Sequence, residues 1–547
     1  MSVASRVVQR LLGLPPAVTR RVSLQRNIPV RTRDGVALMT DHYAPDVPDA
    51  ATILIRSPYG RRGTVGLMMG NALAECGFHV VLQSCRGTFD SGGDFVPMRH
   101  EHDDGMDTLD WVAAQPWFTG KLFTYGPSYV GYTQWAIAAD AGDRISGMLT
   151  AVTASSFRAP TYAGGSFSLD TILNWATLVH NQGGSLLSFI IKQARRRPYL
   201  KRAWTHLPLG EADLIAAGAE IAFFREWLAS AEDEDYWLGR AHGDRIESVT
   251  APVCMVGGWM DIFLPWQLAD YARMRAAGHR PRLVIGPWTH ASQELFGASI
   301  AEGVDFFNVQ LGRRPAPPKD VHVFVQGADE WRDFETWPPA GRTTELAIRP
   351  GGALDFGTAA AIATGPKSDR FRYDPADPTL SVGGALFTTG GGAVDNRSLE
   401  ARPDVVVYSS EPLTEAIEAV GPVAATIAVR TSSEFFDLFV RLCDVHPDGR
   451  SINVCDGLTR VDPRGSAFAT ECPPDADGIR RVPVDLWPTA HRFQPGHRLR
   501  VQVSGGAHPR WARNSGTGDP MATASVLVPI DVEVFESELA MHQLDVG

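Results

Sequence analysis

From Pro29 onward the chain alternates extended apolar runs with helical ones, and this alternation constrains the fold more than any other feature. Residues 52–56, 79–83 and 122–125 are typical of buried strands, whereas residues 105–114 and 133–139 are typical of helices. Strands that alternate with helices form parallel sheets, because each parallel pair needs a helix-length crossover. The first part of the chain therefore predicts an α/β fold.

This alternation stops near Ser155. About ninety residues, up to Val249, carry Leu, Trp, Ala and charged side chains at helical spacing, most clearly over 212–228. Strand signals return at 253–256, 283–285 and 321–326, so a helical domain interrupts the α/β domain. We assign residues 1–154 and 250–336 to the α/β domain and 155–249 to the helical insertion.

After about Trp337 the sequence changes to Gly-rich turns, such as residues 390–392, and short alternating runs. The strand candidates are 405–408, 425–429, 438–442, 497–503 and 524–528. Runs of this kind, separated by turn residues and with few helical stretches, are typical of a β-sandwich or jelly roll. Residues 337–547 are therefore predicted to form a jelly-roll domain.

The charge and cysteine content narrow the environment and the partners of the protein. A formal net charge of −11 repels phosphate backbones, which disfavours a general nucleic-acid binder. No run approaches the ~18 uninterrupted apolar residues of a membrane span. Six cysteines without C-x-x-C spacing are expected as buried thiols in a reducing compartment, which favours a cytoplasmic location. The first 33 residues contain seven Arg and no acid, which suits a packed basic helix or, alternatively, a targeting segment.

The sharpest local signal is a serine in a tight turn between a strand and a helix, in the run Thr124-Tyr125-Gly126-Pro127-Ser128-Tyr129-Val130-Gly131. Such a nucleophile elbow needs small neighbours, because the turn lifts the serine hydroxyl off the sheet in strained geometry. It also directs the next N–H, that of Tyr129, toward a developing oxyanion. Val130 occupies the place of the second Gly of G-x-S-x-G, and Gly131 comes one later. Taken alone, a Gly/Ser turn at a helix start explains the run equally well.

Two later strands end in an acid and a histidine. The strand at 253–256 leads into Asp261, and the strand at 283–285 leads into His290. Sites of open α/β sheets lie at the carboxyl ends of strands, and α/β-hydrolases present Ser, Asp and His in this chain order. The order predicts a triad in which His290 takes the Ser128 proton and Asp261 orients His290. Singly, a loop aspartate and a structural histidine are the simpler interpretations.

Several segments together resemble the α/β-hydrolase family that includes bacterial cocaine esterase, α-amino acid ester hydrolases and X-prolyl dipeptidyl aminopeptidases. They are residues 56–59, 85–95, 107–111, 126–131, 133–135, 258–261, 286–290 and 514–518. The family's elbow carries the same late glycine. The resemblance implies a helical cap, a C-terminal jelly roll, and an oxyanion hole made by the Tyr59 hydroxyl and the Tyr129 N–H.

The substrate pocket is less strongly indicated. The resemblance places Trp175 and Phe263 in an aromatic acyl pocket, and Trp259 and Trp288 flank the predicted triad loops, where core packing is the alternative. Ile262 and Phe263 follow Asp261 where α-amino acid ester hydrolases carry an acidic pair that grips a substrate ammonium. An α-amino group would find little charge to pair with at those two positions.

These observations predict a serine hydrolase that cleaves esters, with amides as a further option, of small hydrophobic acyl substrates through an acyl-enzyme on Ser128. The alternatives are an X-prolyl dipeptidyl-peptidase, a β-lactam or amino-acid ester acylase, and, as a remote third, a non-catalytic binding protein. No metal or organic cofactor is expected. The run from His100 to Asp104 is interpreted as carboxylates at a helix start rather than as a metal cluster, and the sequence contains neither a P-loop nor a Rossmann fingerprint. The expected partner is a small ester or amide, and a homodimer is left open.

Overall fold

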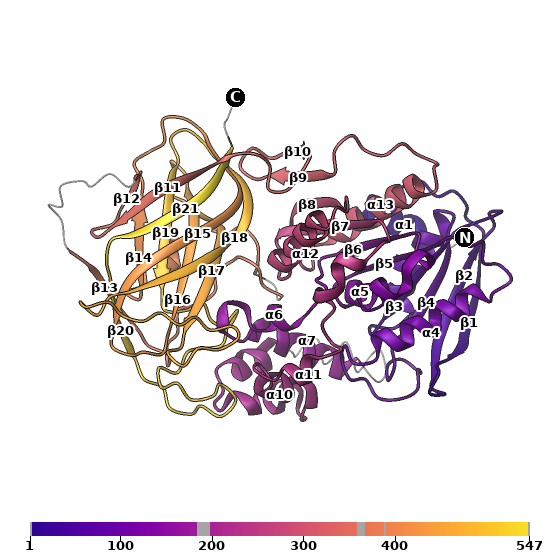
Figure 1. The fold of residues 1–547 in the computed structure, drawn as a ribbon, viewed down its shortest axis with the longest axis horizontal. Helices are drawn as coiled ribbons and strands as arrows, with labels where there is room; N and C mark the ends of the chain where they lie inside the picture. The colour runs from indigo at the N-terminus through magenta and orange to yellow at the C-terminus, as the bar shows by residue number, and fades with distance from the viewer. Residues whose placement is uncertain (1–2, 183–196, 358–366, 388–389, 545–547) are drawn as a thin grey trace. The chain divides into compact units, whose positions relative to one another are not determined.

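The computed structural model describes residues 3–182, 197–357, 367–387 and 390–544 (Figure 1). It consists of two compact units. The first combines Met1–Phe157, Asp235–Gly258 and Phe263–His322, and the second combines Arg158–Glu234, Trp259–Ile262 and Val323–Gly547. Residues 183–196, which are part of the predicted helical insertion at 155–249, lie outside the described ranges.

The first unit is built on a sheet with the strand order β1-β2-β4-β3-β5-β6-β7-β8. The pairs from β4 through β3, β5 and β6 to β7 are parallel, and β1 and β2 add antiparallel pairs. Every residue of β3, β5 and β7 is buried, as expected of a parallel sheet covered on both faces. The strands are β1 (Val22–Arg31), β2 (Ala37–Pro45), β3 (Thr52–Ser57), β4 (His79–Ser84), β5 (Leu122–Pro127), β6 (Gly147–Ala151), β7 (Val253–Met260) and β8 (Arg282–Thr289).

Helices pack on this sheet, and α4 and α5 lie side by side on it (Figure 1). None of the helices in the described ranges combines the length and the hydropathy that crossing a bilayer requires. The α-helices of this unit are α1 (Val3–Leu11), α2 (Gly63–Val65), α3 (Ala72–Glu75), α4 (Glu101–Ala113), α5 (Tyr129–Ala141), α12 (Leu264–Ala276) and α13 (Gln293–Gln310), and α11 (Glu234–Trp237) crosses the boundary between the units. A π-helix lies at Gly66–Asn71, and 3₁₀-helices lie at Gly142–Arg144 and Gly243–Ser248.

The start of the basic N-terminal segment forms helix α1, and a buried acid anchors this helix. Ser5 donates a hydrogen bond of 2.6 Å to Glu75 of α3, and Arg20 forms an ion pair with the same carboxylate. The packed basic helix favoured by the sequence is thus present. All six cysteines are buried free thiols, as predicted.

A buried carboxylate of α12 holds the segment after β6 in place. Asp270 accepts hydrogen bonds of 2.7 Å from both the N–H and the hydroxyl of Ser155. Burial raises the pKa of Asp270 to about 7, even though the Ser155 bonds and the charge of Arg273 act in the opposite direction. The folded unit therefore binds a proton here that the unfolded chain, with a carboxyl pKa of about 3.9, releases.

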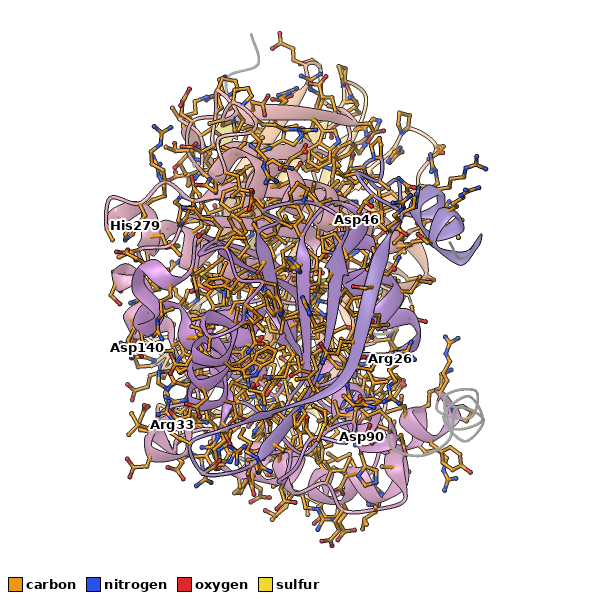
Figure 2. All side chains as sticks on the ribbon, turned by 90° about the vertical axis from the view of Figure 1, so that its right-hand side faces the viewer. Arg26, Arg33, Asp46, Asp90, Asp140 and His279 are labelled. Atoms are coloured by element: carbon orange, nitrogen blue, oxygen red, sulfur yellow. The ribbon has the colours of Figure 1, made fainter. Side chains whose placement is uncertain are left out.

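Since the folded state holds the extra proton, this group's contribution to stability is complete below the unfolded pKa and is lost as the pH rises from about 4 through about 7. The loss is on the order of 4 kcal/mol, at 1.36 kcal/mol per pKa unit. We expect Asp270→Asn, which mimics the protonated acid, to be more stable than wild type at pH 8 and to differ little at pH 4. Urea titrations at both pH values test this, with the exposed Asp46→Asn (Figure 2) as the control. If the free energy of unfolding of Asp270→Asn depended on pH as steeply as that of wild type, Asp270 would not be the group responsible.

The second unit is rich in β-structure, which confirms the predicted β-rich C-terminal region of an α/β protein. Most of its strands form one sheet in the order β13-β20-β15-β21-β11-β12-β14-β19-β16-β17, with β18 paired to β15. The strands are β11 (Arg342–Arg349), β12 (Ala353–Phe356), β13 (Asp369–Tyr373), β14 (Val405–Ser409), β15 (Ile417–Thr431), β16 (Phe436–Val445), β17 (Ser451–Val461), β18 (Arg480–Phe493), β19 (Arg498–Ser504), β20 (Ile530–Val534) and β21 (Ser537–Leu544), preceded by β9 (Val321–Val325), which begins in the first unit, and β10 (Glu330–Phe334). Inward-facing Val, Leu, Ile and Phe from these strands make one core.

The helical spacing over 212–228 corresponds to two helices, because Gly218 ends α9 with a positive φ of 76°. One local prediction for this unit is wrong. Residues 524–528 form no strand: Val526 and Val528 are 57% and 41% exposed, and the following Pro529 has no N–H to donate to a ladder. The helices here are α6 (Arg158–Thr161), α7 (Leu169–Asn181), α9 (Ala212–Ala217), α10 (Ala222–Ala229) and α14 (Arg397–Glu400), with short turns at Ala163–Gly165 and Leu209–Glu211.

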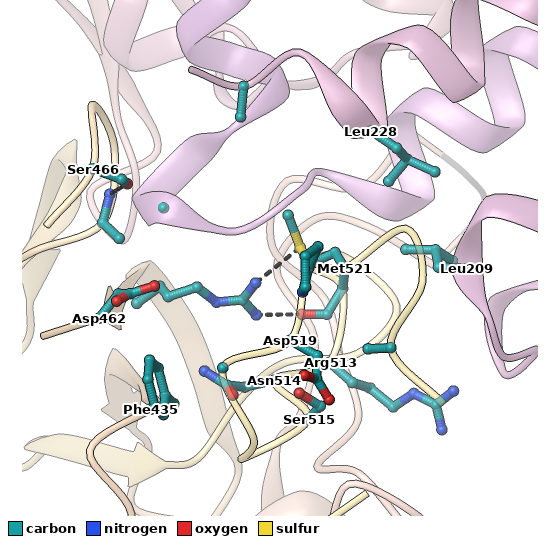
Figure 3. Close-up of a pocket in the computed structure, with 18 of the residues that line it drawn as sticks. Leu209, Leu228, Phe435, Asp462, Ser466, Arg513, Asn514, Ser515, Asp519 and Met521 are labelled. Atoms are coloured by element: carbon teal, nitrogen blue, oxygen red, sulfur yellow. Dashed lines mark hydrogen bonds between the residues drawn. The ribbon is translucent and has the colours of Figure 1, made fainter. Parts of the chain in front are cut away.

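The described residues of the helical insertion within Arg158–Glu234 pack against loops of the β-rich region inside this unit. Ser166 donates a hydrogen bond to Ala512 O, and the Ala512 N–H donates one to Phe167 O. Between the helices and these loops lies a cavity of about 470 Å³, lined by apolar side chains such as Leu228 and by Arg460. The Arg460 guanidinium donates to the Met521 sulfur and to Ala512 O (dashed lines in Figure 3). Most of the insertion therefore shares its packing with the C-terminal region.

Candidate active site

Ser128 connects β5, which ends at Pro127, directly to α5, which begins at Tyr129. Its φ of 55° and ψ of −128° are strained for a residue with a Cβ. The Ser128 N–H donates to Ala151 O at 2.9 Å, and its carbonyl accepts from the Gly131 N–H at 2.8 Å. The turn is therefore held from both sides, and the half-buried serine hydroxyl is presented at the carboxyl end of β5.

Two glycines make this turn possible. A Cβ on Gly126 would lie 2.2 Å from Cγ1 of Val130, and one on Gly131 would lie 2.4 Å from Cγ2 of Thr153. Val130 is 1% exposed and fills the space beside Gly126, whereas Gly131 allows the helix to approach the segment after β6. The late glycine of the sequence is therefore the position where steric room is needed.

His290 follows β8, and its Nε2 lies 3.1 Å from Ser128 Oγ. The imidazole is 6% exposed, so solvent does not compete strongly for its nitrogen. A serine hydroxyl within hydrogen-bond reach of an imidazole is the arrangement of a nucleophile with its general base. Tertiary structure thus brings together two residues that are 162 positions apart in the chain.

Asp261 is the first residue after β7, and its side chain is buried. The strand β7 lies next to β8 in the sheet order. Residues Trp259–Ile262 are grouped with the second unit, whereas Ser128 and His290 lie in the first. The role of Asp261 as the acid of the triad stays a prediction.

The two predicted oxyanion donors differ in their surroundings. Tyr129 is the first residue of α5, where the positive end of the helix dipole lies. Its phenol is buried. The hydroxyl donates a hydrogen bond of 2.9 Å to Glu101 Oε1 and accepts one of 2.7 Å from the Met98 N–H. The side chain of Tyr129 is thus structural, and only its main-chain N–H is a candidate donor. Tyr59 is half-buried two residues beyond β3, and its N–H donates to Ser57 Oγ at 3.0 Å.

Beneath the elbow lies a buried ion pair that the sequence did not reveal. Arg56 Nη2 lies 2.9 Å from Glu101 Oε2, and Arg56 Nη1 donates to Glu101 O at 2.6 Å. The carbonyl of Arg56 accepts from the Thr133 hydroxyl of α5. Through Glu101 and Tyr129, the ion pair therefore supports the start of α5. The neighbouring Cys85 is buried, which raises the pKa of its thiol well above the usual value, so this cysteine is not a competing nucleophile.

The acidic and histidine run at 100–104 occupies the first turn of α4, as predicted. Its side chains diverge: Glu101 points to Arg56, whereas His102 Nε2 lies 2.8 Å from Asp140 Oδ2 (Asp140 is labelled in Figure 2). Within the described residues, the side chains of this run do not gather as ligands of one ion.

An aromatic cluster adjoins the catalytic pair. The ring of Phe263 lies 5.6 Å from that of His290 and stacks on Phe157 at 4.6 Å. Phe157 in turn lies 5.1 Å from Tyr132 of α5. Phe263 was expected near the site, whereas Phe157 and Tyr132 were missed. An apolar surface of this kind beside a nucleophile suits an apolar acyl group.

The three predicted pocket tryptophans have defined packing partners. Trp288 belongs to the hydrophobic core around the sheet, where its ring covers Gly286. Trp259 donates its indole N–H to Phe324 O at 2.6 Å. Trp175 stacks on Trp227 with ring centroids 5.8 Å apart. Substrate contact by Trp175, Trp259 and Trp288 stays a prediction.

Comparison with known proteins places the chain among serine hydrolases. The family X-Pro dipeptidyl-peptidase (S15 family) matches residues 34–292, and the X-Pro dipeptidyl-peptidase C-terminal non-catalytic domain matches residues 316–527. Cocaine esterase from Rhodococcus sp. (strain MB1 Bresler) is 32% identical, with 91% of this chain and 94% of the relative covered.

Two solved structures share the fold over nearly the whole chain. An aminopeptidase from the marine sediment archaeon Thaumarchaeota archaeon has a TM-score of 0.81 at 22% identity. The match covers 97% of this chain and 98% of the aminopeptidase chain. An α-amino acid ester hydrolase has a TM-score of 0.80 at 20% identity, with the same coverage. At these identities the likeness is one of fold.

Proposed function

Because the chain belongs to the X-Pro dipeptidyl-peptidase (S15) family, together with cocaine esterase, and is a serine hydrolase acting on ester or amide bonds, we propose that it is an esterase for small substrates with an apolar acyl group. The observation that carries the proposal is the 3.1 Å approach of His290 Nε2 to the strained Ser128. The substrate is a small molecule.

The proposed reaction proceeds through an acyl-enzyme on Ser128. Ser128 Oγ attacks the ester carbonyl while His290 Nε2 takes the hydroxyl proton, and His290 then gives this proton to the leaving alcohol. A water molecule that loses a proton to His290 attacks the acyl carbonyl, and the acid leaves as Ser128 regains its proton. No cofactor is needed for these steps.

The supporting roles are assigned by position. Asp261, following β7 as His290 follows β8, is proposed to accept a hydrogen bond from the Nδ1–H of His290 and so fix its tautomer. The Tyr129 N–H and the Tyr59 hydroxyl are proposed to stabilise the oxyanion. A single donor of this kind is typically worth about 3 kcal/mol of the barrier.

The preference for an apolar acyl group rests on the aromatic cluster formed by Phe157, Phe263 and Tyr132 beside His290. The name of the relative with 32% identity, cocaine esterase, supports an ester substrate. The rival activities are the release of X-Pro dipeptides from the N-terminus of a peptide and acylase activity on amino-acid esters. Both require recognition of an ammonium group. Ile262 and Phe263 supply no negative charge for it.

A direct comparison of substrates tests the proposal. We expect kcat/KM for 4-nitrophenyl benzoate to exceed that for glycyl-prolyl-4-nitroanilide and for phenylglycine methyl ester by roughly 100-fold, since one unpaired ammonium in an apolar site costs about 3 kcal/mol. Phe263→Ala should reduce this ratio, because it should lower kcat/KM for the aryl ester and leave kcat/KM for the other two substrates unchanged. Faster cleavage of the dipeptide anilide than of the aryl ester would refute the proposed substrate class.

The helical segment 155–249 is proposed as a cap and residues 337–547 as a jelly roll, with residues 1–154 and 250–336 as the catalytic domain. The C-terminal segment is the region matched by the family's non-catalytic domain. A homodimer and a cytoplasmic location stay predictions from the sequence.

A further inference from the structure

At one end of the β-rich unit, a hairpin brings a carboxylate together with imidazoles. Asp444 is the last but one residue of β16, and His446 begins the turn to β17. The antiparallel pairing of β16 with β19 sets Val445 opposite Arg498, so that His446 and His497 are next in register. Asp444 and His446 continue the same face, because alternate residues of an extended chain point to the same side.

These side chains meet closely. Asp444 is 2% exposed, with Oδ1 lying 2.7 Å from His497 Nδ1 and Oδ2 lying 2.9 Å from His491 Nε2. The rings of His446 and His497 are 4.4 Å apart. One ligand atom from each of Asp444, His446 and His497 lies within 4.8 Å of the other two. Three imidazoles thus surround one buried carboxylate.

We propose that Asp444, His446 and His497 bind a divalent transition-metal ion in the β-rich unit. Metal bonds to imidazole and carboxylate are about 2.0–2.2 Å long, so the ligand atoms of a tetrahedral site lie about 3.4 Å apart. The ligand atoms of Asp444, His446 and His497 are now at most 4.8 Å apart. Bringing them to the tetrahedral spacing needs side-chain rotations that move these atoms by on the order of an ångström. The geometry is therefore within reach of rotamer adjustment alone.

The ligand set points to the class of ion. Imidazole nitrogen suits Zn²⁺, Co²⁺, Ni²⁺ and Cu²⁺, whereas Mg²⁺ and Ca²⁺ favour sites made of oxygen alone. His491 would hold the second carboxylate oxygen, as outer partners of metal ligands commonly do. A water molecule would complete the coordination.

The backbone around the site is well held. The His446 N–H donates to Arg450 O at 2.8 Å, and its carbonyl accepts from the Gly449 N–H at 2.8 Å, which closes the turn between β16 and β17. A bound ion would tie this turn to the segment before β19. The role we infer is therefore structural: it stabilises the β-rich unit and lies outside the hydrolytic reaction.

Isothermal titration of the chelator-treated full chain with ZnCl₂ tests the site. We expect one ion per chain, and we expect His446→Ala and His497→Ala each to weaken binding by roughly 100-fold or more. Co²⁺ in place of Zn²⁺ should give visible absorption bands of tetrahedral coordination in wild type that both variants lack. His279→Ala, which changes a half-buried histidine of the first unit (Figure 2), is the control and should bind like wild type.

A second readout separates ligation from folding. Zn²⁺ should raise the Tm of wild type but not of His497→Gln, which keeps a polar side chain beside Asp444 and should have an unchanged Tm in metal-free buffer. Hydrolysis of an aryl ester should not depend on Zn²⁺. Equal Zn²⁺ affinity in wild type and in both histidine variants, or no binding by wild type at micromolar concentrations, would overturn the proposal.

Discussion

Ser128→Ala is expected to lower kcat/KM for aryl ester hydrolysis by on the order of 10⁴- to 10⁶-fold, because it removes the only atom proposed to bond to the acyl group. Residual turnover would come from the oxyanion donors and from substrate binding. Intact-protein mass after treatment with a fluorophosphonate measures the nucleophile without requiring a known substrate. Wild type should gain one adduct and Ser128→Ala none.

The same experiment extends to the rest of the proposed triad. His290→Ala should lose nearly as much activity as Ser128→Ala, and the double variant little more, because nucleophile and base act as one unit. Asp261→Asn should retain the fold and lose activity through the wrong tautomer of His290. Near-normal turnover in Ser128→Ala, or an adduct on that variant, would contradict the assignment of the nucleophile.

The second large effect is expected at the ion pair beneath the elbow. Glu101→Ala removes the carboxylate that lies 2.9 Å from the 2%-exposed side chain of Arg56, leaving that of Asp104 at 4.0 Å, and it removes the acceptor of the Tyr129 phenol. Removal of one member of a buried ion pair typically costs about 3–5 kcal/mol. We expect a loss of this size in the free energy of unfolding of the first unit, measured as urea-induced loss of fluorophosphonate labelling.

Two further variants isolate the cause. Asp103 lies in the same turn of α4, and its side chain is 59% exposed. Asp103→Ala should therefore change the free energy of unfolding by less than about 1 kcal/mol. Replacing both partners, Arg56→Met with Glu101→Leu, should recover much of the stability, since no unpaired charge is then buried. A Glu101→Ala protein as stable as wild type would show that the ion pair does not support the elbow.

Several parts of the site were predictable because they depend on local patterns. The strand ends before Ser128, Asp261 and His290 were visible as apolar runs followed by Gly-rich turns, and α5 was expected just after the serine. The carboxyl ends of parallel strands lie along one edge of a sheet, so the order of the motifs in the chain indicated that Ser128 and His290 would meet.

Other parts escaped prediction because they depend on packing between distant segments. Arg56 lies within an apolar strand, and Glu101 lies in a run that looks like an ordinary helix start; nothing local indicates that they pair. Phe157 lies in the loop directly before α6 and carries no motif. The segment 524–528 alternates like a strand, but it finds no neighbouring strand, and the Val528 N–H bonds to Ser515 O in a loop.

The sequence by itself determined the α/β class, the β-rich C-terminal region, the family and the serine of the elbow, because periodicity, glycine positions and motif order are properties of the chain. Tertiary structure alone decided the 3.1 Å contact of Ser128 with His290, the buried support at Glu101 and the grouping of most of the helical insertion with the C-terminal strands. The physical reason is that burial and the pairing of charges depend on which distant surfaces meet, and no local pattern encodes that choice.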